Sequence, residues 1–282
     1  MDPMLKRVFT GFFAFIVMLC GVFLFNYFLF SICAGAVLLW LAWEWWSFSA
    51  DLKIKLKVLF LFFLGGVLAL IYILKLYIQG VYLNYLNNIF LLMGFGLALL
   101  AVIFVLLPLS KTKFLVRSDS LVLFSFLFLI PTWVALLYLK HTGVWALFSA
   151  LLIPIVADTG AYFSGYLFGK RKMAPQVSPK KTWEGALGGM LLTGIFSTLL
   201  FKFLGNEAQA DWLGLFGFFG LSIGLVLLAI FGDLFESLLK RHAEIKDSGS
   251  FLPGHGGIFD RLDSLLFVLP TFALLQVLGH FY

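Results

Sequence analysis

The polar residues of this sequence gather in one stretch, from Asp233 to Asp263, which lies between two long apolar runs. The carboxylates of the stretch are Asp233, Glu236, Glu244, Asp247, Asp260 and Asp263, the fixed cations are Lys240, Arg241, Lys246 and Arg261, and the histidines are His242 and His255. Nearly all of the surrounding sequence is apolar. A segment this polar between membrane-type runs is where we look for chemistry.

The spacing of these residues brings several of them together. Asp233, Glu236 and Lys240 stand at positions i, i+3 and i+7, so on a helix they share one face. Asp260 and Asp263 are three residues apart, and we expect them to share a face of the next helix. Between these two groups, the turn at 253–257 contains three glycines, which permit positive φ and close approach of the backbone to an anion.

Two kinds of chemistry suit this inventory. Carboxylates gathered at helix ends suit Mg²⁺, a hard cation that takes oxygen ligands and often shares them with substrate phosphates. Lysine and arginine beside them suit the phosphates themselves. The plain alternative is a solvated loop whose charges pair with one another. It explains the cations well, but not why Asp233 and Glu236 stand at the end of an apolar run, or why three glycines surround His255.

Composition indicates which elements must hold this stretch. Of the 282 residues, 62% are hydrophobic and 12% are charged, which excludes an ordinary soluble domain. The apolar runs are continuous and close to the length of about 20 residues that crosses a bilayer, unlike the alternating strands of a membrane barrel. We therefore predict an all-α polytopic integral membrane protein with about nine transmembrane helices. The expected spans are 8–25, a run ending near Trp43, Trp45 and Trp46, 58–74, 89–107, 121–139, 144–168, 186–204, 213–231 and 264–278. The three tryptophans are typical of an interfacial belt.

Basic residues predict the orientation. With nine spans, 17 of the 20 lysine and arginine residues fall on the side of the N-terminus, which the positive-inside rule makes cytoplasmic and which puts the C-terminus on the opposite side. The same placement accounts for the net charge of +6 without a nucleic-acid partner. We divide the chain into 1–140, with the first five helices, and 141–282, with the last four and a catalytic site that faces the cytoplasm.

A second polar cluster precedes the first. Asp158 lies inside the sixth apolar run, where a carboxylate costs about 2.5–3.5 kcal/mol, so it is either functional or bound to a neighbouring helix. In the run 178–182, Ser178 and Pro179 are expected to form a turn. Lys180 and Lys181 then lie at the mouth of the seventh span.

Several of these motifs resemble one family. The segment from Ser237 to Asp263, SLLKRHAEIKDSGSFLPGHGGIFDRLD, resembles the signature of phosphatidate cytidylyltransferases, also called CDP-diacylglycerol synthases. The runs ADTGAY from Ala157 and SPKKT from Ser178 are similar to further motifs of that family. The resemblance covers about 154–264 and does not reach the first five spans. It implies a nucleotidyltransferase that moves CMP from CTP to phosphatidate and releases pyrophosphate, the first committed step of CDP-diacylglycerol-dependent phospholipid synthesis.

The resemblance also implies partners and a location. It implies a metal-dependent enzyme with Mg²⁺, one or two cations per site, in the inner (cytoplasmic) membrane of the cell. CTP, phosphatidate and membrane lipids are the expected partners. Gly188 and Gly189 are compatible with a homodimer contact or with close packing inside the chain.

Roles for single residues follow from the needs of this reaction. Both reactants are polyanions, and a phosphate monoester, whose second pKa is about 6, needs positioning more than a general base. The expected metal ligands are Asp233, Asp260 and Asp263, followed by Asp247, Glu236 and Asp158. The expected phosphate ligands are Lys180, Lys181, Lys240, Arg241, Lys246, Arg261 and His255, which is expected to donate a hydrogen bond rather than act as a base. The catalytic set is Asp233, Asp260, Asp263, Lys240, Arg241, Arg261 and His255.

Two other functions stay open at this point. A lipid kinase that uses CTP would need similar residues, but it would move the γ-phosphate and release CDP. A transporter of an anionic solute would explain Asp158 within a span. Transporters usually show repeated halves, however, and here the polar residues are confined to the C-terminal half.

Overall fold

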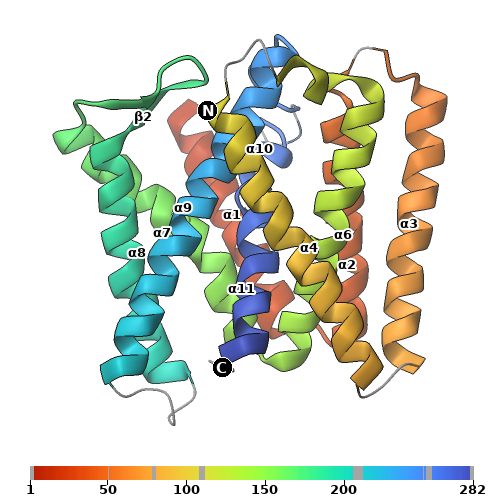
Figure 1. Cartoon of the computed structure of the whole chain (residues 1–282), viewed down its shortest axis with the longest axis horizontal. Helices are drawn as coiled ribbons and strands as arrows, with labels where there is room; N and C mark the ends of the chain where they lie inside the picture. Colours follow the sequence, from red (N-terminus) through yellow and green to blue (C-terminus); the bar gives the residue numbers. More distant parts are fainter. Residues whose placement is uncertain are drawn as a thin grey trace.

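A computed structural model describes residues 3–49, 51–77, 81–107, 112–205, 212–249, 251 and 256–279. The chain is a bundle of long helices, as the apolar runs predict (Figure 1). The helices are α1 Pro3–Phe23, α2 Tyr27–Trp46, α3 Ile54–Tyr77, α4 Val81–Leu106, the 3-10 turn η1 Lys113–Val116, α6 Ser118–Thr142, α7 Val144–Phe168, α8 Trp183–Leu204, α9 Trp212–His242, α10 Phe259–Leu262 and α11 Leu265–Gly279.

The all-α membrane architecture is confirmed. Within the described ranges, eight helices are long and apolar enough to cross a membrane, and Thr10–Phe23 of α1 forms a shorter apolar segment. The total of nine spans stays a prediction. Figure 1 places the start of α1 and the end of α11 at opposite ends of the bundle, and the turn between α9 and α10 lies at the same end as the start of α1.

Aromatic side chains fill the interior between α2, α6 and α11. Trp45 and Trp46 are 1% and 0% exposed, so the expectation that they form an interfacial belt is wrong. Trp46 Nε1 donates a hydrogen bond of 2.7 Å to Ser125 Oγ on α6, and Trp45 packs against Phe128. These tryptophans are buried because side chains of α3, α6 and α10 pack against them, and these contacts cannot be read from the local sequence.

Small residues bring α7 and α8 close together. A Cβ on Gly189 would lie 2.7 Å from the carbonyl oxygen of Ala157, and one on Gly185 would lie 2.9 Å from that of Ala161. Gly188 faces Ser164 in the same way. Between the two interpretations of Gly188 and Gly189, these contacts support close packing within the chain.

A small β-hairpin joins α7 to α8, an addition to the predicted all-helical fold. Strand β1, Lys172–Ala174, pairs antiparallel with β2, Ser178–Thr182, with Lys172 opposite Thr182. The turn lies at 175–177, so the prediction of a turn at Ser178 was wrong. The hairpin lies above the ends of α7 and α8 (Figure 1), and its buried residue Val177 accepts a hydrogen bond of 3.0 Å from Arg241 Nε.

Candidate active site

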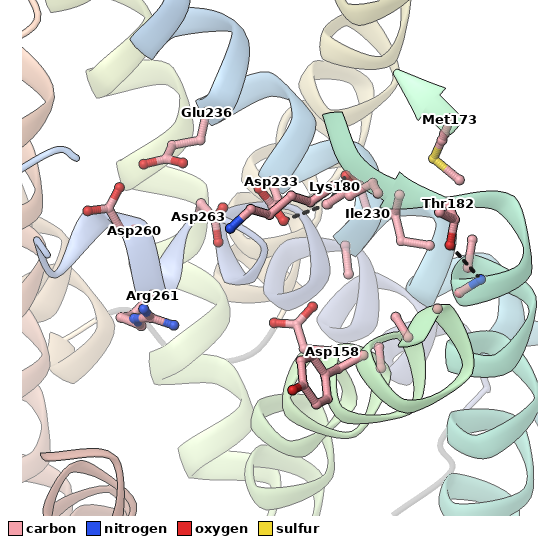
Figure 2. A pocket seen from close by; sticks show the side chains of 18 of the residues that line it. Asp158, Met173, Lys180, Thr182, Ile230, Asp233, Glu236, Asp260, Arg261 and Asp263 are labelled. Atoms are coloured by element: carbon pink, nitrogen blue, oxygen red, sulfur yellow. Dashed lines mark hydrogen bonds and ion pairs between the residues drawn. The ribbon is translucent and has the colours of Figure 1, made fainter. Parts of the chain in front are cut away.

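A cavity of 610 Å³ opens between α7, α8, α9, α10 and strand β2, and it collects most of the polar residues singled out from the sequence (Figure 2). Its charged lining residues are Asp158, Lys180, Lys181, Asp233, Glu236, Lys240, Asp260, Arg261 and Asp263. Residues far apart in the sequence therefore share one pocket within a bundle of apolar helices.

Three carboxylates converge at the wall of this cavity. Asp233, Glu236 and Asp263 each offer a ligand oxygen, and these oxygens lie within 4.8 Å of one another. Glu236 and Asp263 are 1% and 7% exposed. Three acidic groups so close together, two of them buried, repel one another unless a cation lies between them.

The hydrogen bonds of this group leave room for a ligand. Asp263 Oδ1 accepts bonds of 2.6 Å from the Ser264 amide and 3.2 Å from its hydroxyl. Glu236 Oε1 is buried and has no hydrogen-bond partner in the part of the chain that the structure describes. A buried carboxylate oxygen without a donor is unfavourable by itself and is a suitable ligand for a hard divalent cation. The residues present therefore fit a metal.

The fold positions the three carboxylates from two elements. Asp233 and Glu236 lie on α9, which continues to His242, so the predicted shared face with Lys240 is present. Asp263 follows the single turn of α10. The approach of the two elements depends on Gly232, where a Cβ would lie 2.8 Å from the Phe267 ring and 3.1 Å from Ser264 Cα.

Asp260 has different partners from Asp263, although a shared face was predicted. Asp260 Oδ1 accepts a bond of 2.8 Å from Lys240 Nζ, and Oδ2 accepts bonds of 3.0 Å from the Ser248 amide and 2.8 Å from the Gly257 amide. Asp260 lies outside the group of three carboxylates, and its two oxygens are held instead by Lys240 and by the amides of the turn. Its role as a metal ligand stays a prediction.

Two lysines contact the carboxylates directly. Lys181 Nζ lies 2.6 Å from Asp233 Oδ2 and 3.2 Å from the Ile230 carbonyl oxygen. Lys240 Nζ lies 2.5 Å from Glu236 Oε2 as well as near Asp260. Both lysines are partly buried, so their charges are screened less than those of surface pairs.

The remaining predicted residues lie at different distances from this centre. Asp158 on α7 and Arg261 on α10 point into the cavity (Figure 2), and Lys180 lines it from β2. Lys246 and Asp247 are exposed in the turn after α9 and do not line the cavity. His255 lies outside the described residues, and its predicted hydrogen bond to phosphate stays a prediction.

Local hydrogen bonds hold the hairpin that carries Lys180 and Lys181. The Thr182 hydroxyl caps α8 by accepting a bond of 3.2 Å from the Gly185 amide. The Glu184 carboxylate, in the first turn of α8, accepts from the amides of Lys170 and Arg171, which immediately follow α7. These bonds close the loop on itself and fix the strand that ends beside the cavity.

One polar residue that the sequence reasoning passed over is Glu44 on α2. It is 5% exposed and hydrogen-bonds to the segment around α10, far away in the sequence. The signal was present, since Glu44 is an acid within an apolar run, as Asp158 is. Its partners could not be identified without the tertiary structure.

The fold and the cavity together define a polytopic membrane protein with buried carboxylates and lysines at one open site. A model of the cytidylyltransferase family matches residues 5–278, which includes the first five helices that the motif resemblance did not reach. A phosphatidate cytidylyltransferase of Haemophilus influenzae is 38% identical over 286 residues, covering 95% of this chain and 96% of that protein. One of Pseudomonas aeruginosa is 44% identical over 154 residues, covering 53% of this chain and 54% of that protein. This chain belongs to the cytidylyltransferase family, which confirms the resemblance found in its motifs.

Proposed function

We propose that the chain transfers CMP from CTP to the phosphate of phosphatidate, giving CDP-diacylglycerol and pyrophosphate. A phosphate oxygen of phosphatidate forms a bond to the α-phosphorus of CTP, and the bond from that phosphorus to the bridging oxygen of the β-phosphate breaks. The observation that carries the proposal is the group of three carboxylates in one open cavity, with Lys181 in direct contact with Asp233 and Lys240 in direct contact with Glu236. Family membership and the names of the relatives agree with it.

Charge is the main problem that the site must solve. Both substrates are polyanions, and negative charge develops on the leaving pyrophosphate. Lys181 and Lys240, with Lys180 and Arg261 at the cavity wall, are cations that can neutralise these phosphates. The described lining of the cavity contains no serine or cysteine that could act as a covalent nucleophile, which suits direct attack by the lipid phosphate.

We assign Mg²⁺ to the group of Asp233, Glu236 and Asp263. The unpartnered oxygen of Glu236 supports this assignment, as does the preference of Mg²⁺ for oxygen ligands that it shares with phosphate. When bound, the ion would neutralise negative charge on the phosphates and the leaving group.

The lipid substrate is expected to enter sideways from the membrane. Tyr162 and Tyr166 line the cavity from α7 and yet are 68% and 79% exposed, so the cavity is open along this helix. Phosphatidate could keep its acyl chains in the bilayer while its phosphate reaches the lysines. Residues 141–282 supply every residue of the cavity lining in the described ranges, which supports the proposed division of the chain.

We further propose that the protein lies in the inner membrane with this cavity facing the cytoplasm, where CTP is present. The excess of lysine and arginine on the side of the N-terminus supports this orientation. The homodimer also stays a prediction.

The test is a labelling experiment on the purified protein in detergent with phosphatidate and Mg²⁺. We expect label from the α-phosphate of CTP to enter the lipid with an equal amount of pyrophosphate. Transfer of label from the γ-phosphate instead would identify a lipid kinase. If neither label moves while the protein stays folded, the proposal is wrong and transport should be measured.

A further inference from the structure

Glu44 is a buried acid whose hydrogen bonds join α2 to the segment around α10. Its Oε2 atom accepts bonds of 2.8 Å from the Phe259 amide and 3.1 Å from the Ser248 hydroxyl. Its Oε1 atom accepts a bond of 2.9 Å from Trp40 Nε1, one helical turn earlier. The carboxylate is thus well supplied with donors, in contrast to Glu236.

The two residues that Glu44 binds on the far side of the sequence, Ser248 and Phe259, lie on either side of the turn between α9 and α10. Ser248 follows α9, and Phe259 opens α10. One carboxylate oxygen therefore holds the outgoing and the returning parts of the turn together. The same two parts also bind Asp260, which accepts bonds from the amides of Ser248 and Gly257.

Backbone packing around Glu44 is close enough to require glycine. A Cβ on Gly249 would lie 2.9 Å from Glu44 Oε1, and a Cβ on Gly257 would overlap Glu44 Oε2 and the Ser248 hydroxyl. The side chain of Glu44 thus occupies the space between the two parts of the turn. Its removal would leave a void and take the acceptor from three donors, two of which, the Ser248 hydroxyl and the Phe259 amide, are buried.

A short chain of contacts links this anchor to the cavity. Ser248, whose hydroxyl binds Glu44, donates its amide to Asp260. Asp260 accepts a bond from Lys240 Nζ, and Lys240 contacts Glu236. Displacement of the turn would therefore displace Asp260 and then Lys240, which line the cavity.

We propose that Glu44 is a positioning residue for the reaction: from the N-terminal half, it holds the turn that orients Asp260 and Lys240 in the cavity. Glu44 is absent from the cavity lining, so it acts through the turn and does not touch the substrates. This inference rests on the proposed function for its catalytic consequence. It also gives the N-terminal helices a role in the site, although all the described residues that line the cavity come from the C-terminal half.

The first test compares Glu44→Ala with Trp40→Phe in the labelling assay. Both changes remove hydrogen bonds of the same carboxylate, but Trp40→Phe leaves the two bonds to the turn in place. We expect kcat of Glu44→Ala to fall about tenfold to hundredfold, since two buried donors lose their acceptor, with KM for phosphatidate unchanged. Trp40→Phe should stay within about twofold of the wild type. Equal kcat for Glu44→Ala and wild type, per folded molecule, would overturn the proposal.

The second test is independent of activity. Hydrogen exchange of peptides that cover 244–262 should speed up in Glu44→Ala, while exchange in α7 and α8 stays as in the wild type. Faster exchange throughout the bundle would indicate a general structural role and overturn the proposal. If the wild type shows no cytidylyl transfer, the proposed function fails, whereas the exchange data still test whether Glu44 holds the turn.

Two milder variants cover the case in which Glu44→Ala does not fold. Glu44→Gln keeps the shape of the side chain but replaces one acceptor oxygen with an amide donor. Ser248→Ala removes the hydrogen bond from the Ser248 hydroxyl to Glu44 Oε2. Each should lower kcat about threefold to tenfold, and the double variant should lose less than the product of the two losses because both act on one anchor. If the loss of kcat in the double variant equals the product of the two single losses, the two residues act independently and the proposal of one shared anchor is wrong.

Discussion

Two regions of this protein bury acidic side chains among apolar helices, and their hydrogen bonding differs. At Glu44, one carboxylate accepts three hydrogen bonds from Trp40, Ser248 and Phe259. At the cavity, three carboxylates lie within 4.8 Å of one another, and one buried oxygen of Glu236 has no partner among the described residues. In the first region, the protein supplies hydrogen-bond donors to both oxygens of the carboxylate. In the second, there are more acceptor oxygens than donors.

The difference separates a structural anchor from a ligand site. A buried carboxylate whose donors are all supplied by the chain is held in one geometry and needs nothing further. Carboxylates that lack donors are stable together only with a cation from outside or with the lysines that lie beside them. Burial of an acid therefore does not identify a binding site by itself; the balance of donors and acceptors does.

The largest effect should come from removal of a charge in the acceptor-rich region. Asp263→Asn should lower cytidylyl transfer by about a thousandfold, because a ligand is lost where the two polyanions must be neutralised. Folding should be unaffected, as judged by size exclusion in detergent. The control is Asp119→Asn, an acid whose side chain is 68% exposed in an ion pair with Arg117. Activity of Asp263→Asn near that of the control would remove Asp263 from the site.

Neutralisation should lower the stability of the region around Glu44 but not that of the acidic group at the cavity. In EDTA, Glu236→Gln should leave the thermal midpoint unchanged or raise it. The repulsion within the acidic group falls, while Lys240 keeps its ion pair with Asp260. Glu44→Gln should lower the free energy of unfolding by about 1–3 kcal/mol, because a buried donor then faces another donor. Thermal unfolding followed in detergent measures both.

Added Mg²⁺ sharpens the same contrast. It should raise the midpoint of the wild type and of Glu44→Gln, but raise that of Glu236→Gln much less, since only a ligand of the ion changes its affinity. An equal increase in all three proteins would show that the ion binds elsewhere.

The smallest effect should come from a change in the distance between the elements that carry the acids. Gly232→Ala would place a Cβ 3.1 Å from Ser264 Cα and push α9 away from the turn at Asp263. We expect cytidylyl transfer to fall about threefold to tenfold, with a loss of stability of about 1–3 kcal/mol from overpacking. Gly224→Ala is the matched control on the same helix, because a Cβ there meets nothing within 4 Å. Equal effects at both positions would mean that the approach of α9 does not govern the site.

The sequence by itself determined the membrane class, the presence of long apolar helices and the side chains of α9 that share a face. These features depend on residues close together in the chain, through runs of about 20 apolar residues and the helical repeat. The signature from Ser237 to Asp263 also identified the family. Motif and periodicity are local, so both could be recognised without coordinates.

Tertiary structure alone decided which acids meet. Asp260 and Asp263 looked equivalent from their spacing, yet one binds Lys240 and the amides of the turn and the other joins Asp233 and Glu236. Glu44 acquires its partners across 204 and 215 residues of sequence, and Trp45 is buried by elements far along the chain. Such pairings depend on how the helices pack against one another, because the side chains that supply donors and fill space come from segments with no fixed spacing in the sequence.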